Sequence, residues 1–150
     1  RSGLRHKKRS MEFLKKKTQV ADKTQALVAG QRPTSKQAGD AAEDRALQHL
    51  QAAGLRLLEC NYRTPGRGGG EIDLIMRDAD GTLVFVEVRQ RASASHGGAA
   101  ASVGAVKQRR IVFAARFYLT RLREPPPCRF DVVAIEAGEL TWLRAAFDAF

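Results

Sequence analysis

The segment from Gly70 to Arg91 decides the fold, and it reads GEIDLIMRDADGTLVFVEVRQR. Two runs rich in Ile, Leu, Val and Phe flank residues 78–81, whose Asp-Gly pair is typical of a β-hairpin turn. Such runs are too apolar for strands that are open to water on one face. The segment therefore predicts an antiparallel hairpin that is largely buried.

Alternate side chains of a strand share a face, so the hairpin residues can be sorted into two sets. In the first strand the acidic side chains oppose the apolar ones: Glu71 and Asp73 against Ile72, Leu74 and Met76. In the second strand the polar side chains share a face with the aromatic ring, and the valines lie on the other face. The first set is Glu87, Arg89 and Phe85, and the second is Val84, Val86 and Val88.

The carboxylates in the middle of these runs are the anomaly. A buried carboxylate without a cation costs several kcal/mol, and it usually takes up a proton or finds a partner. Asp73 and Glu87 would repel each other across the hairpin unless a positive group sat between them. Two interpretations follow. Either a divalent cation such as Mg²⁺ lies there, or the acids face solvent and pair with nearby arginines.

Length and composition suggest one domain in a reducing compartment. The chain has 150 residues, enough for a single core, and no apolar run of the roughly 20 residues that a membrane span needs. No signal peptide is visible, and Cys60 and Cys128 lie far apart without metal-type spacing. We therefore expect a cytoplasmic protein that is not in a membrane and has no histidine-based zinc site.

The positive charge is concentrated at the start of the chain. Of the formal net charge of +10, residues 1–37 contribute eleven Lys and Arg against two acids, whereas residues 38–150 carry fifteen against fourteen. Residues 1–35 are expected to form a flexible basic arm, and residues 36–150 the folded domain. The arm fits three interpretations: a non-specific phosphate binder, a solvated tail, or residues that precede a start at Met11.

Periodicity and breakers predict a helix, three strands, a second helix and one or two further strands. The boundaries are a helix from a cap at Thr34 or Ser35 to about Ala53, strands at 55–63, 71–77 and 83–91, a helix from a cap at Ser102 to about Leu119 or Arg121, a strand at 129–136 and an edge strand at 140–143. Residues 144–150 should pack back or mediate a contact. This order predicts an α/β fold in which helices cover a sheet of four to five strands.

Each predicted helix carries a charged residue in or beside its apolar stripe. Glu43 falls between Leu47 and Leu50, and it either pairs with an arginine at the surface or points toward the hairpin acids. Lys107 falls inside the apolar arc of the second helix, with Arg110 close by. Lys107 is either a stem that reaches past the core to water or a neighbour of a phosphate or metal site.

Taken together, these motifs resemble the YraN-like family of uncharacterised bacterial proteins over about residues 36–143. The resemblance rests on the helical glutamate, on GEIDLI and VFVEVR in the hairpin, and on the later KQRRI and RFDVV segments. That family is similar in fold to restriction endonucleases and archaeal Holliday-junction resolvases, which share an Asp…Glu-X-Lys signature. The resemblance implies a restriction-endonuclease-like core with a mixed sheet flanked by helices.

Carried over residue by residue, the resemblance implies a Mg²⁺ or Mn²⁺ site. Asp73 and Glu87 would be its acids, the main-chain carbonyl of Val88 a further ligand, and Glu43 a support for the metal or its waters. Arg89 stands where the signature has lysine. Arginine stays protonated but can hold a phosphate bidentately. The proton of the attacking water would then pass to metal-bound hydroxide, a carboxylate or a substrate phosphate oxygen.

The implied function is a metal-dependent endonuclease that hydrolyses phosphodiester bonds in DNA, with branched or single-stranded DNA as substrate. Arg89, Lys107 and Arg110 would bind phosphate, and a homodimer would match the related resolvases. The alternative is a non-catalytic module that keeps the nuclease fold and binds nucleic acid or protein. Arg89 and the nearly neutral charge of residues 38–150 favour this alternative.

Overall fold

The computed structural model describes residues 32, 34–91 and 103–149. The chain divides after Thr34 into two units, and the fold described here is that of the second, Ser35–Phe150. The expected flexible arm of residues 1–35 therefore lies almost wholly outside the described residues, as do the Ser102 cap and Phe150.

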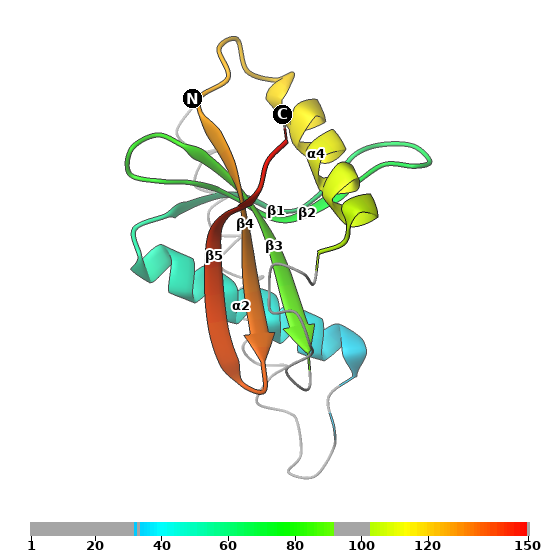
Figure 1. The fold of residues 1–150 in the computed structure, drawn as a ribbon, viewed down its shortest axis with the longest axis vertical. Helices are drawn as coiled ribbons and strands as arrows, with labels where there is room; N and C mark the ends of the chain where they lie inside the picture. Colours follow the sequence, from blue (N-terminus) through cyan, green and yellow to red (C-terminus); the bar gives the residue numbers. More distant parts are fainter. Residues whose placement is uncertain (1–31, 33, 92–102, 150) are drawn as a thin grey trace, which may run out of the picture. The chain divides into compact units, whose positions relative to one another are not determined.

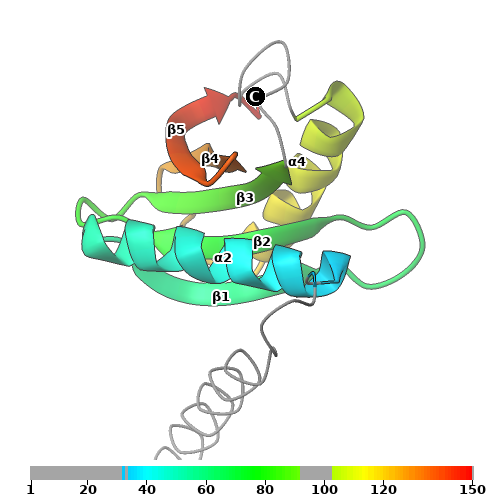
Figure 2. The same cartoon turned by 90° about the horizontal axis from the view of Figure 1, so that it is seen from below.

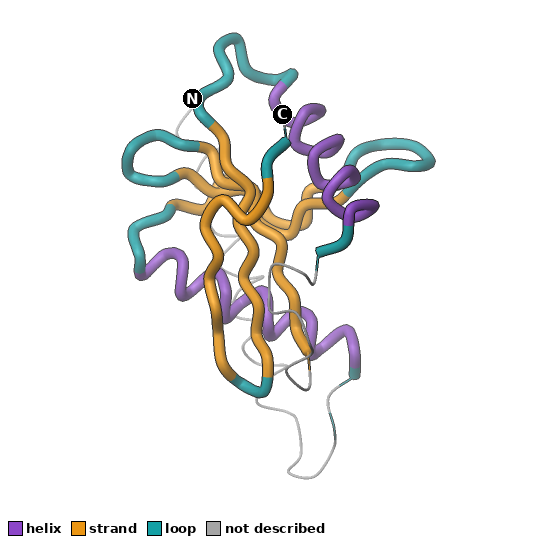
Figure 3. Tube along the Cα trace, in the orientation of Figure 1, coloured by secondary structure: helices purple, strands orange, loops and turns teal. Residues whose placement is uncertain are grey.

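The elements follow the predicted order, and Figures 1 and 3 trace them along the chain. They are α2 (Ser35–Ala52), β1 (Arg56–Arg63), β2 (Glu71–Arg77), β3 (Leu83–Arg91), α4 (Ala105–Leu119), β4 (Cys128–Glu136) and β5 (Glu139–Phe147). The five strands form one sheet in the order β1-β2-β3-β4-β5. Only β3 and β4 are parallel, because the crossover through α4 joins them. The α/β class with a mixed sheet flanked by helices is confirmed.

The hairpin of β2 and β3 forms around the predicted turn. The amide of Gly81 donates to the carbonyl of Asp78, and the Asp80 carboxylate accepts from the amide of Thr82. Gly81 has a φ of 89°, a conformation that side-chain-bearing residues rarely adopt. Gly54, with a φ of 100°, likewise follows α2, close to the predicted helix end at about Ala53.

The two helices cover opposite faces of the sheet, and each face has its own apolar cluster. On the α2 face Ala46 and Leu50 pack against Leu74, Val84 and other strand residues. On the α4 face Ile111 and Ala114 pack against Ile75, Phe85 and Phe130, among others. Figure 2 shows α2 running alongside β1 and β2. Within the described residues, no helix is both long enough and apolar enough to cross a membrane.

One predicted face is wrong. Ile72 belongs to the α4 cluster, whereas Leu74 and Met76 belong to the α2 cluster, so the three do not share a face. The irregularity coincides with Asn61 on β1, which has a φ of 52° between the residues that pair with Ile72 and Leu74. By contrast, the predicted separation of Phe85 from the valines of β3 is confirmed.

Two boundaries differ from the prediction. Helix α4 begins at Ala105 with Gly104 as its N-cap, without a side-chain hydrogen bond at that cap. Strand β5 is the predicted edge strand, but it continues through Phe147 instead of ending at Leu143. The Phe147 ring stacks on Phe130 with centroids 5.0 Å apart. The chain after Leu143 therefore packs back as a continuation of the strand.

Candidate functional site

The candidate site lies where the hydrogen-bond ladder between β2 and β3 ends. The ladder runs from Arg77 opposite Leu83 to Leu74 opposite Val86 and goes no further. One residue beyond it, the Asp73 Oδ2 atom accepts a 2.8 Å hydrogen bond from the backbone amide of Val88. A side chain thus takes the place of a strand carbonyl, which fixes the Asp73 carboxylate beside Glu87.

Glu87 is buried at the same place, with 3% of its surface exposed, and its partner comes from α4. The Lys107 ammonium lies 2.6 Å from the Glu87 Oε1 atom. The Lys107 side chain remains 45% exposed. Lys107 therefore does more than reach past the core to water, because its charged end contacts Glu87, one of the predicted metal ligands.

The electrostatics of the acid pair favour a retained proton. Burial, and then the neighbouring Asp73 carboxylate, raise the pKa of Glu87 to about 7, although Lys107 opposes this shift. Burial also raises the pKa of Asp73, and the Val88 amide and a hydrogen bond with Glu87 limit that rise. Below its own pKa Glu87 carries a proton that it can donate to Asp73, and above it the single positive charge on Lys107 faces two carboxylates.

Glu43 interacts electrostatically with the acid pair, through the charge of Asp73. Burial raises the pKa of Glu43 to about 7, and the carboxylates of Asp73, Asp40 and Glu71 add to the rise. Asn61 partly offsets it with a side-chain hydrogen bond. Over the described parts of the chain, no three Asp, Glu, His or Cys side chains form a group that could hold a metal ion as they stand. The arrangement is thus a pair of carboxylates with a third acid in their field.

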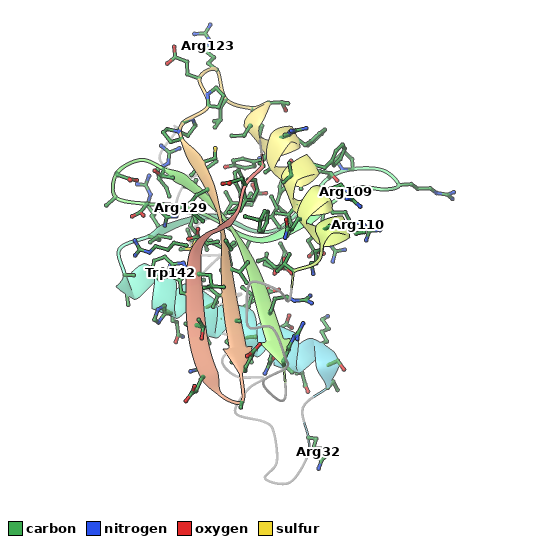
Figure 4. All side chains as sticks on the ribbon, viewed as in Figure 1. Arg32, Arg109, Arg110, Arg123, Arg129 and Trp142 are labelled. Carbon is green, nitrogen blue, oxygen red and sulfur yellow. The ribbon has the colours of Figure 1, made fainter. Side chains whose placement is uncertain are left out.

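The two remaining predicted site residues, Arg89 and Arg110, lie on separate elements. Arg89 follows Glu87 by two positions on β3, so the strand repeat puts both on the same face. Arg110 and Lys107 line a groove of about 710 Å³ together with Arg63 and residues of the glycine-rich loop at 64–70. Figure 4 shows Arg110 on α4. Three basic side chains and one acid, Glu71, therefore line the groove, and Arg63 pairs with Glu71 at 3.4 Å.

Close contact between Gly70 and α4 sets this geometry. A Cβ atom at Gly70 would collide with the main-chain oxygen of Arg110. Thr64 closes the preceding loop, because its Oγ1 atom accepts a 2.8 Å hydrogen bond from the Gly70 amide. The backbone of Gly70 therefore lies against α4, the helix that carries Lys107.

Comparison with known proteins identifies the family. Residues 42–135 match the sequence model of the uncharacterised protein family UPF0102. The chain belongs to this family. The UPF0102 proteins of Albidiferax ferrireducens and Paracidovorax citrulli are 78% and 70% identical to it, over 77% and 81% of this chain and 91% and 90% of theirs. That of Polaromonas naphthalenivorans is 61% identical over 90% of this chain and 96% of its own. The YraN-like resemblance is confirmed.

In this UPF0102 protein, sequence reasoning missed two features of the site. The first is Asn61, whose left-handed backbone and hydrogen bond to Glu43 have no signal beyond the tolerance of asparagine for that conformation. The second is the direct contact of Lys107 with Glu87. Its signal was present, since a lysine in an apolar arc needs a partner, but the sequence alone does not name that partner.

Proposed function

We propose that this UPF0102 protein is a Mg²⁺- or Mn²⁺-dependent nuclease that hydrolyses phosphodiester bonds in DNA. The observation that supports it is the pairing of the buried Glu87 with the partly buried Asp73 where the β2–β3 ladder ends. A structural role alone would favour well-compensated acids, whereas both pKa values here are raised by burial.

The residues present fit a divalent cation. Mg²⁺ takes oxygen ligands, keeps several waters and is often bound by only one or two carboxylates together with substrate phosphate. Asp73 and Glu87 would supply those carboxylates, the Val88 carbonyl would be a further ligand, and Glu43 would support the waters. A cation bound there would act as a Lewis acid on the phosphate and would lower the pKa of an attacking water.

The side chains of the chain itself have distinct tasks in this proposal. The Val88 amide holds Asp73 in one orientation, and Lys107 holds Glu87. Arg89 stays charged, so it would bind the scissile phosphate and stabilise negative charge in the transition state without taking up a proton. Lys107 and Arg110 would bind phosphates along the groove that they line.

One observation favours the alternative, a module that binds nucleic acid or protein without turnover. Lys107 already gives Glu87 a positive partner, so part of the charge is compensated without a metal ion. A module of this kind would bind DNA in a salt-dependent way, and its binding would not depend on Asp73 or Glu87.

Incubation of the full chain with plasmid, single-stranded and four-way-junction DNA in the presence of Mn²⁺ tests the proposal. We expect cleavage that Asp73→Asn lowers by about 100-fold or more. The control is Glu124→Gln, an exposed acid outside the site, which should cleave like the wild type. No cleavage of any substrate, or equal cleavage by Asp73→Asn, would contradict the nuclease. DNA binding without cleavage by the wild type, together with equal binding by the Asp73→Asn/Glu87→Gln protein, would support the module.

A further inference from the structure

Helix α4 and the residues after it carry a concentration of positive charge that the overall balance hides. Residues 38–150 hold nearly equal numbers of basic and acidic side chains, yet residues 105–123 hold six basic ones and no acid. They are Lys107, Arg109, Arg110, Arg116, Arg121 and Arg123. Figure 4 shows Arg109, Arg110 and Arg123 on this segment. A partner of this segment is therefore expected to be anionic.

The same helix exposes apolar side chains. Val106, Phe113 and Phe117 are 56%, 53% and 41% exposed. In the part of the chain that the structure describes, Leu58 is the only other large apolar side chain that is exposed. At about 100° per residue the three α4 positions lie within about 40° of one another around the helix. They form a stripe on the side of α4 that faces away from the apolar cluster.

Arginines border this stripe on both sides. On the helix circumference Arg109 and Arg116 lie on one side of the stripe and Arg110 lies on the other. Arg109, Phe113 and Arg116 also line a common groove of about 510 Å³, which Asp148 lines as well, so two basic side chains face one acid there. We call the three apolar residues and these three arginines the outer face of α4.

The chemistry of the outer face selects among its possible occupants. A second copy that docked through the same face would bring three arginines against three arginines, which like-charge repulsion opposes. A nucleic acid with unpaired bases matches both components. Bases stack on aromatic rings, and phosphates pair with arginine. In a duplex the faces of the bases are stacked on one another, so an aromatic stripe gains little from them.

The position of the face agrees with this occupant. Arg110 belongs to the outer face and also lines the groove that holds Lys107, whose ammonium contacts Glu87. A strand that lies on α4 can therefore continue across Arg110 toward the acid pair. We infer that the outer face of α4 binds unpaired nucleotides, with bases on Phe113 and Phe117 and phosphates on the bordering arginines. The inference rests on the proposed function, because it names the substrate class as nucleic acid with a single-stranded portion.

Metal-free binding tests this inference separately from cleavage. The full chain, in EDTA, is titrated into a labelled DNA single strand and into the same strand annealed to its complement, and anisotropy is measured. We expect Phe113→Ala/Phe117→Ala to weaken single-strand binding about tenfold or more and duplex binding by less than about twofold. The matched control is Leu58→Ala, an exposed apolar residue on β1, which should bind both DNAs like the wild type.

A second variant reports stacking directly. Phe113→Trp should retain binding, and the added single strand should quench its fluorescence beyond the change in the wild type, whose only tryptophan is Trp142. Three results would overturn the inference: no added quenching, equal weakening of single-strand and duplex binding, or unchanged binding in the double alanine variant. It would also be overturned if the double variant lost only self-association, by light scattering, or only binding to anionic lipid vesicles.

If single-strand binding does not depend on Phe113 and Phe117 while Mn²⁺-dependent cleavage persists, the substrate strand binds elsewhere and the proposed nuclease function is retained. If single-strand binding depends on Phe113 and Phe117 while no DNA is cleaved, the outer face stands and the nuclease does not.

Discussion

Two buried carboxylates on neighbouring strands of the same sheet have opposite surroundings. Asp131 on β4 is fully buried, and it accepts from Arg129 Nε at 3.1 Å, from Trp142 Nε1 at 3.0 Å and from the Ala145 amide at 3.0 Å. Glu87 on β3 is almost as buried, but its partners are the Lys107 ammonium and a second acid, Asp73. Burial of an acid is therefore not what marks the candidate site; the nature of its partners is.

The partners also differ in how firmly they are held. The donors to Asp131 are an indole ring, a main-chain amide and an arginine that is itself tied to Asp78 at 2.8 Å. Figure 4 shows Arg129 and Trp142. Lys107 is a flexible, half-exposed side chain that can turn toward a phosphate. We interpret the Asp131 network as structural and the Glu87 pair as adaptable.

Replacement of each acid by its amide should give the largest difference between the two acids, measured as the free energy of unfolding. Asp131→Asn removes the charge that compensates Arg129, so it should lower the free energy of unfolding by about 3 kcal/mol. Glu87→Gln removes one of two repelling carboxylates and leaves Lys107 able to reach water, so it should change that free energy by less than about 1 kcal/mol. Urea unfolding at pH 7.5 measures both values. Equal losses would show that the two acids have the same structural role.

The contact of Gly70 with α4 gives the next largest effect. Gly70→Ala should push α4 away from the sheet and separate Lys107 from Glu87, at a cost of about 2 kcal/mol. The control is Gly39→Ala, a site in α2 with open space around it, which should be neutral or slightly stabilising.

Urea unfolding measures the free energy of unfolding of both glycine variants. DNA cleavage should follow the same order, with Gly70→Ala less active than Gly39→Ala. A Gly70→Ala protein as stable and as active as Gly39→Ala would show that the loop does not seat α4 against the acid pair.

A smaller effect is expected in the pH dependence of the free energy of unfolding, to which Glu87 contributes. Because the pKa of Glu87 rises from 4.5 in the unfolded chain to about 7 in the fold, the folded protein retains a proton that the unfolded chain has lost between these values. Stability should therefore fall as pH rises through this window, by about 1–2 kcal/mol from this group. Glu87→Gln should lose that part of the slope in urea unfolding at a series of pH values. A slope identical to that of the wild type would contradict the raised pKa.

Much of the fold could be predicted because its signals are local. The Asp-Gly turn fixes the hairpin, Gly54 ends α2, and the β3 alternation separates Phe85 from Val84 and Val86. The position of Ile72 could not be predicted, since the change of face coincides with the left-handed backbone of Asn61 on the neighbouring strand, which the sequence of β2 does not signal. Local patterns also do not mark where a strand ladder ends, so the Asp73–Val88 hydrogen bond was out of reach.

The sequence predicts which charged residues of the candidate site are unusual, but not which of them contact one another. Glu43 and Lys107 stood out because each is charged and lies in an apolar stripe, and Asp73 and Glu87 because they interrupt apolar strands. Which of them meet depends on tertiary packing: Lys107 contacts Glu87 through the seating of α4 on Gly70. The apolar stripe of α4 could not be predicted to be exposed, because helical periodicity identifies an apolar face but does not tell whether that face is buried.

The most direct test of the account is the melting temperature of the full chain at pH 8 with and without Mn²⁺. A cation that binds only the folded acid pair must stabilise it, by about 2.7 kcal/mol at 100 times the dissociation constant, or by about 5 °C or more. We predict this rise in the wild type and in the exposed-acid control Glu124→Gln, and its loss in Glu87→Gln. No rise in the wild type, or the same rise in Glu87→Gln, would contradict a cation site at Asp73 and Glu87.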